Sequence, residues 1–176
     1  IKESTRLIAH GAFYGCTGLT SITIPKSVTS IDMWAFKDCT GLTSATIPNS
    51  VTSIGSEAFK GCSALTSITI PESVTSIGRL AFKDCESLTS IVVEDGNSVY
   101  DSREESNAII ESSTNTLLVG CNNTIIPSSV TSIGYLAFSG CSGLTSVEIG
   151  NSVTSIGSYA FYLCENLKMV FNRSDL

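Results

Sequence analysis

Cysteine is the residue type whose recurrence in this 176-residue chain first raises the question of chemistry. Six of the seven cysteines stand three residues after a phenylalanine; they are Cys16, Cys39, Cys62, Cys85, Cys141 and Cys164. A disulfide framework is one interpretation of such a series. However, equivalent residues of successive repeats point the same way, and a disulfide requires a specific geometry between two Cβ atoms. We therefore predict a row of buried, inert thiols, with Cys121 outside the row.

The other candidate metal ligands are one histidine and a group of carboxylates. His10 is isolated and no Cys-x-x-Cys pair occurs, so nothing in the spacing indicates a zinc site. Six carboxylates lie within residues 94–111: Glu94, Asp95, Asp101, Glu104, Glu105 and Glu111. Their spacing differs from that of an EF-hand loop, so we expect a solvated acidic loop, with calcium binding as the alternative. We predict no metal and no cofactor.

No set of side chains in the sequence suits acid–base or nucleophilic catalysis. A serine triad needs a histidine that is oriented by a carboxylate, and His10 is the only histidine. The chain also lacks a glycine-rich phosphate loop and a nucleophile elbow. We therefore predict that the chain is not an enzyme and has no catalytic residues.

An internal repeat of 23 residues positions the cysteines and their neighbours. Complete copies occupy residues 19–41, 42–64, 65–87 and 144–166, and partial copies occupy residues 1–18 and 167–176. Each complete copy opens with a segment such as Leu-Thr-Ser-Ile-Thr-Ile-Pro, whose alternating apolar residues predict a strand with one buried face. In the last third of each copy, the three-residue spacing of phenylalanine and cysteine predicts a short helical or 3-10 turn.

The repeat is interrupted in the second half of the chain. Residues 88–143 form an irregular repeat, in which 107–112 and 115–120 are short apolar runs joined by a polar turn. This arrangement predicts a β-hairpin.

A serine recurs before the first valine of the repeat, and its hydroxyl is expected to bond to the backbone of an adjacent coil. These serines are Ser27, Ser50, Ser73, Ser129 and Ser152.

The repeat L-x-x-I-x-I-P-x-x-V-x-x-I-G-x-x-A-F-x-x-C resembles the leucine-rich repeat of BspA-like bacterial surface proteins and their treponemal relatives. The resemblance implies a β-rich α/β fold, in which a right-handed solenoid has a parallel sheet on its concave face and short helical turns opposite. It also implies that the irregular segment is an enlarged repeat, not a separate domain. The matching residues there are Asn97, Tyr100, Ser102, Ile109, Ile110, Asn115, Thr116, Leu117 and Leu118.

Composition and charge narrow the classes of partner. Basic residues are scattered, the net charge is −6, and no apolar stretch approaches the roughly 20 residues of a membrane span. We therefore expect neither nucleic-acid binding nor membrane insertion in this segment. Both ends fall inside a repeat, which predicts one leucine-rich-repeat domain over residues 1–176 that is a segment of a longer chain. Its uncapped edges could pair with those of a second copy.

Two rows of side chains are candidate binding surfaces. The first consists of residues that precede each Ala-Phe pair, where the copies differ most: Trp34, Glu57, Leu80, Tyr135 and Tyr159. Large apolar residues in such a row suit a protein contact, whereas folding back as partial core is the alternative. The second row is threonine on the expected strand face: Thr23, Thr46 and Thr69. Strand propensity and solubility explain these threonines equally well.

Three functions follow from these features. The leading one is an adhesin-type module on a cell-surface or secreted protein, which binds host extracellular-matrix proteins or microbial surface proteins; this prediction rests mainly on the family resemblance. The second is an architectural spacer that holds another domain away from the cell. The third is binding of ice or carbohydrate surfaces by threonine ladders, which we disfavour because Val92 and Glu148 interrupt the column.

Overall fold

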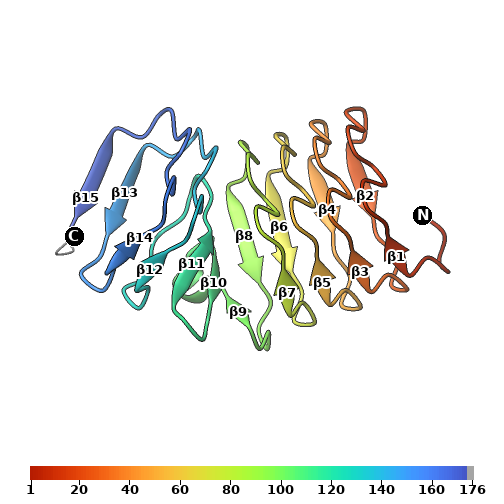
Figure 1. Cartoon of the computed structure of the whole chain (residues 1–176), viewed down its shortest axis with the longest axis horizontal. Helices are drawn as coiled ribbons and strands as arrows, with labels where there is room; N and C mark the ends of the chain where they lie inside the picture. The colour runs from red at the N-terminus through yellow and green to blue at the C-terminus, as the bar shows by residue number, and fades with distance from the viewer. Residues whose placement is uncertain (174–176) are drawn as a thin grey trace.

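The computed structural model describes residues 1–173 and shows a β-solenoid whose coils lie side by side along the long axis of the molecule (Figure 1). The residues 174–176 of the last partial copy lie outside the described part. Two four-stranded parallel sheets run along the regular coils. One contains β2 (Ser21–Thr23), β4 (Ser44–Thr46), β6 (Ser67–Ile70) and β8 (Ser90–Val93). The other contains β1 (Leu7–Ile8), β3 (Ser30–Ile31), β5 (Ser53–Ile54) and β7 (Ser76–Ile77).

The repeat period sets the register of these sheets. Ser21 lies opposite Ser44, and Ser67 lies opposite Ser90, so that each pair joins equivalent residues of neighbouring copies. The pattern returns in the C-terminal coils, where β13 (Ser146–Ile149) pairs in parallel with β15 (Met169–Asn172). The expected coil of parallel strands is therefore confirmed.

The predicted helical turns are absent, which corrects the α/β assignment. Within residues 1–173 the one 3-10 helix is η1 (Arg103–Glu105), which lies outside the regular copies. The segments around each Ala-Phe pair are hydrogen-bonded turns instead, in which Ala35 N–H bonds to the Asp32 carbonyl at 3.3 Å. The next backbone donor breaks the helical pattern, because Phe36 N–H bonds across to Ala58 of the following coil at 2.8 Å. Successive N–H groups thus bond alternately within the turn and to the next coil, so that no helix forms.

A ladder of stacked phenylalanine rings fills the core behind these turns. Phe13, Phe36, Phe59 and Phe82 follow one another with centroid separations of 5.1, 5.1 and 5.5 Å. Phe138 and Phe161 resume the stack at 4.9 Å. The buried residues divide into two clusters that meet within the irregular segment, where Ile109 belongs to the first cluster and Ile110 to the second.

The six equivalent cysteines are free thiols, as predicted, and four of them are buried. Their role goes beyond packing, because each buried thiol of the regular coils donates to a phenylalanine carbonyl of the preceding coil. Cys39 Sγ lies 3.0 Å from the Phe13 oxygen, and Cys62 Sγ lies 3.2 Å from the Phe36 oxygen. Cys16 is exposed and Cys164 is half-buried, since both belong to the outermost coils.

The serine hydroxyls also join neighbouring coils. Ser50 Oγ donates to the Val28 carbonyl at 2.7 Å, and Ser73 Oγ donates to the Val51 carbonyl at 2.7 Å. The expected bond to adjacent backbone is thus confirmed for Ser27, Ser50 and Ser73, whereas the exposed Ser152 makes no such bond within residues 1–173. In the irregular region Ser129 instead accepts a hydrogen bond from the Arg103 side chain at 3.3 Å.

The irregular segment replaces one turn with antiparallel strands. The predicted hairpin is present as β10 (Ile109–Glu111) paired with β11 (Thr116–Val119). These strands belong to a five-stranded sheet with β9 (Tyr100–Asp101), β12 (Ser132–Ile133) and β14 (Ser155–Ile156). After β11, Gly120 passes under the ring of Phe138, where the regular coils carry a phenylalanine of their own. The phenylalanine ladder is therefore broken between Phe82 and Phe138.

This close passage makes Gly120→Ala a test of the packing. A Cβ at residue 120 would lie 2.3 Å from Cε1 of Phe138, whose ring is fully buried and has no room to move. We expect Gly120→Ala to lower the free energy of unfolding by about 1–3 kcal/mol in urea titrations followed by circular dichroism. Gly150→Ala is the control, because no atom lies within 4 Å of its Cβ position, and its effect should stay below about 0.5 kcal/mol. Equal stabilities of the two variants would contradict this account.

Candidate functional site

A row of projecting side chains runs along the edge of the solenoid, one coil after another. We call this row, formed by Trp34, Glu57, Leu80, Tyr135 and Tyr159, the ridge. Its backbone is unusual, because Trp34, Glu57, Leu80 and Tyr159 have φ angles of 60, 55, 61 and 58°. Residues other than glycine rarely adopt this left-handed conformation. The first coil places Gly11 there, with a φ of 61°.

The left-handed residues are explained by the coil-to-coil hydrogen bonds. Two of them bond through their N–H groups to the next coil: Trp34 N–H bonds to the Ser56 carbonyl at 3.2 Å, and Glu57 N–H bonds to the Arg79 carbonyl at 2.9 Å. Glycine would adopt this conformation with no steric penalty. Large side chains at the position therefore contribute something that the fold alone does not require.

The N-terminal end of the ridge is an aromatic group with a cation above it. The Trp34 ring lies 5.1 Å from the His10 ring and 6.4 Å from the Tyr14 ring, measured between centroids. Lys37 Nζ lies 4.5 Å from the centre of the Trp34 ring, within the range of a cation–π interaction. The indole Nε1 of Trp34 is buried and has no hydrogen-bond acceptor among the described residues. An unsatisfied buried donor of this kind destabilises a protein by about 1–3 kcal/mol.

Glu57 links this aromatic group to the next coil. Its carboxylate lies 2.8 Å from Lys37 Nζ and 3.3 Å from Lys60 Nζ. The hydrogen bond from Lys37 lowers the pKa of Glu57, and the same contact raises the pKa of Lys37. Glu57 thus stays ionised and holds two lysines along the ridge.

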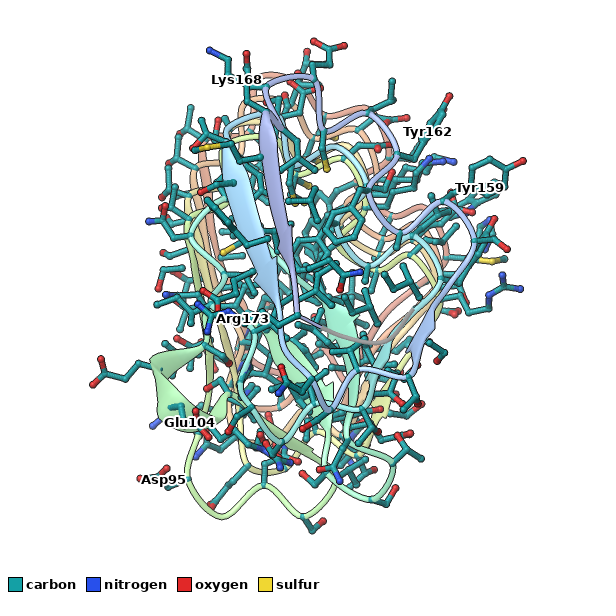
Figure 2. All side chains as sticks on the ribbon, turned by 90° about the vertical axis from the view of Figure 1, so that its left-hand side faces the viewer. Asp95, Glu104, Tyr159, Tyr162, Lys168 and Arg173 are labelled. Carbon is teal, nitrogen blue, oxygen red and sulfur yellow. The ribbon has the colours of Figure 1, made fainter. Side chains whose placement is uncertain are left out.

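The C-terminal end of the ridge is a second, more exposed aromatic group. Tyr159 makes edge-on contacts with Tyr135 and Tyr162 at centroid separations of 6.4 and 5.9 Å. The Arg79 guanidinium lies 5.1 Å from the Tyr135 ring, and Lys83 Nζ lies 5.9 Å from the Tyr162 ring. Tyr159 is 66% exposed, and Figure 2 shows Tyr159 and Tyr162 projecting from the same edge of the coil.

The structure therefore separates the ridge residues into two kinds. Trp34, Glu57 and Leu80 are half-buried, whereas Tyr135 and Tyr159 are exposed. The alternative was that these side chains fold back over the core. It applies in part to Trp34, Glu57 and Leu80, and it does not apply to the two tyrosines. The cations Lys37, Arg79 and Lys83 were not anticipated from the sequence, because their contacts with the aromatic rings depend on how the turns stack.

The threonine row lies on the strand face, apart from the ridge. Thr23, Thr46 and Thr69 are all exposed, and Thr23 lies directly opposite Thr46 in the sheet. The column continues with Val92 opposite Thr69, so that the threonines end at that strand. The row is a short polar surface without charge.

The acidic segment is organised by one arginine. Arg103 pairs with the Asp101 carboxylate and donates to Asn115 Oδ1 at 2.9 Å. Partial burial opposes ionisation of Asp101, but hydrogen bonds from Arg103 and Ser112 outweigh it and lower the pKa of this carboxyl. Within residues 1–173, no group of three or more His, Cys, Asp or Glu side chains is arranged to hold a metal ion. Asp95 and Glu104 project from the opposite end of the coil cross-section to Tyr159 (Figure 2).

The buried thiols have their acidity suppressed. Burial raises the pKa of Cys39 to about 11 and that of Cys62 to about 12. Because the thiolate is the nucleophile, thiols with such pKa values are almost fully protonated near neutral pH and react slowly. The cysteine row is structural in these coils.

The coil geometry and the repeated pattern of buried leucine, isoleucine and phenylalanine define a leucine-rich-repeat solenoid. The BspA-type leucine-rich repeat region matches the chain in six copies, over residues 1–104 and 110–176. The chain belongs to this family. No curated protein matches it.

Solved structures give the same result. A leucine-rich cell surface protein from Faecalibacterium prausnitzii A2-165 is 37% identical, with a TM-score of 0.78 over 92% of this chain and 43% of its own. A leucine-rich repeat protein from Eubacterium ventriosum is 24% identical, with a TM-score of 0.65 over 97% of this chain and 58% of its own. The pneumococcal vaccine antigen PcpA is 20% identical, with a TM-score of 0.62 over 96% of this chain and 56% of its own.

The last two identities are low enough that the likeness concerns the fold alone. The chain spans less than two thirds of the length of each of these three proteins. No helix within residues 1–173 has the length and apolar character to cross a membrane.

The left-handed backbone of the ridge can be tested by a pair of substitutions at Glu57. Glu57→Gly and Glu57→Ala remove the same ion pairs, so any difference between the two variants reports the backbone conformation. Because alanine is strained at a φ of 55° and glycine is not, we expect Glu57→Gly to be more stable by about 1 kcal/mol. Chemical unfolding of both variants measures this difference. If the alanine variant proved the more stable, residue 57 would not be left-handed in solution.

Proposed function

We propose that this chain is a protein-binding module of a bacterial cell-surface protein, of the adhesin type, and that the ridge is its contact surface. The observation that carries the proposal is the exposed group of Tyr135, Tyr159 and Tyr162 beside the cations of Arg79 and Lys83. Tyrosine, tryptophan and arginine are the residues that most often dominate the free energy of protein–protein binding.

The arrangement of the ridge favours binding of a protein over a purely polar surface. Its rings are held in place by edge-on contacts and by cations, so little side-chain freedom remains to be lost when a partner binds. The indole N–H of Trp34 is an unpaired donor within the same ridge. Large side chains held in a left-handed backbone add nothing to the coil itself, which also supports a role in recognition.

A similar protein supports the proposed cell-surface location. The Faecalibacterium protein is described as a cell surface protein, and a solenoid at that location meets matrix proteins and the surface proteins of other cells. Host matrix proteins or microbial surface proteins are therefore the partners that we propose.

An architectural spacer is the second candidate. The uncharged, regular strand face with Thr23, Thr46 and Thr69 supports it, since such a face is soluble and offers little to a partner. A spacer, however, has no need of exposed aromatic side chains along one edge, and for this reason the binding module is favoured.

A solid-phase binding assay against fibronectin, fibrinogen and other matrix glycoproteins tests the proposal. We expect saturable binding by the wild-type chain and a loss of at least about tenfold in affinity for the Trp34→Ala, Tyr159→Ala double variant, because truncated hot-spot residues typically cost 2 kcal/mol or more. The Thr23→Ala, Thr46→Ala double variant is the control for the other face and should bind like the wild type.

Binding that the threonine variant loses and the aromatic variant keeps would place the site on the strand face. No binding above a control protein would favour the spacer over the module.

A further inference from the structure

The stacking of the turns leaves one interface unfilled. In the regular coils each turn sends three backbone hydrogen bonds to the next coil, as from Trp34, Phe36 and Asp38 to the carbonyls of Ser56, Ala58 and Lys60. The turn of residues 56–61 repeats this pattern toward the next coil, and the turn of residues 135–140 repeats it toward the last described coil. The three bonds are therefore the standard interface between neighbouring turns.

The turn of residues 78–84 keeps only one of the three. Asp84 N–H bonds to the Ser139 carbonyl at 3.4 Å, but Leu80 N–H and Phe82 N–H have no acceptor within residues 1–173. The irregular segment causes this, because it crosses the region as β11 and Gly120 and supplies no Ala-Phe turn. On the other wall, the Tyr135 carbonyl likewise lacks a donor among the described residues.

Leu80 and Tyr135 line a groove of about 200 Å³ between the two halves of the solenoid, whereas Phe82 lies outside this groove. Its walls carry Ile77, Leu80, Leu118, Val119 and Tyr135, with the Arg79 side chain at the rim. A smaller cleft of about 30 Å³ continues inward past Lys83 toward Cys85 and Cys141. The groove is apolar at its base and has a backbone donor on one wall and an acceptor on the other.

Hydrogen bonds bound the groove: Ile77 N–H donates to Tyr100 Oη of the irregular segment at 3.1 Å, and further contacts close the end at Asp84. Ser139 Oγ donates to the Asp84 carboxylate at 3.3 Å, and Asn122 donates from its side chain to the Glu86 carbonyl at 2.7 Å. Asn122 also accepts from the Gly143 N–H at 3.0 Å, so that it joins the coils on both sides. Beyond Asp84 the two halves are therefore held together, and the opening lies at residues 78–82.

The chain itself contains the sequence that fills the equivalent place on an earlier coil. Against the turn of residues 33–37, the segment 54–58 supplies the Ser56 and Ala58 carbonyls to the backbone and the Glu57 carboxylate to Lys37. Lys83 stands at the position of Lys37 and lines the smaller cleft beside the groove, but its nearest carboxylate is its neighbour Asp84 at 3.4 Å. The open turn thus presents the same donors and the same lysine without the segment that they match.

We infer that this groove binds an extended segment of a partner protein in which an apolar residue precedes an acidic one by about three positions, as in Ile-Gly-Ser-Glu-Ala. One of its carbonyls accepts from Leu80 N–H, its apolar side chain packs on Ile77 and Val119, and its carboxylate pairs with Lys83 beside the adjoining cleft. Addition of backbone to an open edge is an established mode of peptide recognition, in which the backbone supplies affinity and side chains supply specificity.

The occupant is a partner protein and not a second copy, because the chain's own copy of this sequence is packed between coils, where Ile54 is buried. Phe82 is also covered, so the partner has no need to bring a ring. The inference rests on the proposed protein-binding function, because Leu80 and Tyr135 of the ridge form part of the groove.

Titration of the isotope-labelled chain with the capped peptide Ile-Gly-Ser-Glu-Ala, followed by nuclear magnetic resonance, tests the inference. Few contacts are made, so we expect a dissociation constant on the order of 1 mM, with saturable shifts of the Leu80 and Phe82 amide resonances. The same peptide with glutamine in place of glutamate should bind about two- to fivefold more weakly, as for the loss of an exposed ion pair.

Two variants locate the charge contact. Lys83→Met should remove the difference between the two peptides, whereas Lys26→Met, which neutralises an exposed lysine outside the groove, should preserve it. The two wild-type titrations carry the test if Lys83→Met fails to fold. Unchanged Leu80 and Phe82 resonances at ~10 mM peptide, tenfold above the expected constant, would overturn the inference.

The result is separable from that of the matrix-protein assay. Peptide binding without matrix binding would support the groove and reject that panel of partners, whereas matrix binding without peptide binding would support the module and reject the groove.

Discussion

The hydrogen bonds between neighbouring coils are the interaction on which the rest of this structure depends. Each turn beside the phenylalanine ladder divides its backbone donors between itself and the next coil, as Ala35 and Phe36 do. Because the donors alternate in this way, the turns do not form a helix, and the ridge residues adopt a left-handed backbone. The thiol of Cys39 donates to a carbonyl of the preceding coil. A single coil alone could not satisfy the donors that bond to its neighbour, such as Phe36 N–H, so the fold depends on the stack.

The predictable parts of the fold are those that follow from the constant length of the sequence repeat. A fixed repeat length places equivalent residues side by side, and this is why Ser21 lies opposite Ser44 and why the buried cysteines form a row of thiols. The hairpin of β10 and β11 was predictable because two apolar runs flank a polar turn. The helical turns were predicted wrongly, since a three-residue spacing suits a helix and a stacked turn equally, and the sequence pattern cannot show which carbonyl an N–H will choose.

The candidate site was predictable only in outline. Variation between copies at Trp34 and Tyr159 indicated a surface row, but two of the cations beside it, Arg79 and Lys83, contact rings of other coils. The left-handed backbone had one sequence signal, which is Gly11 in the first coil at the place where the others carry large side chains. The open groove had none, because it results from a turn that the irregular segment does not supply. The ridge and the groove share Leu80 and Tyr135, so an aromatic contact surface and an unfilled backbone edge form one continuous region.

Amide hydrogen exchange of the free chain tests the central claim most directly. If coil-to-coil hydrogen bonds hold the stack and are missing at the irregular segment, the Phe36 and Phe59 amides will exchange slowly, while those of Leu80 and Phe82 will exchange much faster. All three turns carry a ring of the same phenylalanine stack, so burial of the rings alone predicts no such difference. Equal protection of Phe59 and Phe82 would contradict the account and show that the interface between the two halves is closed in solution.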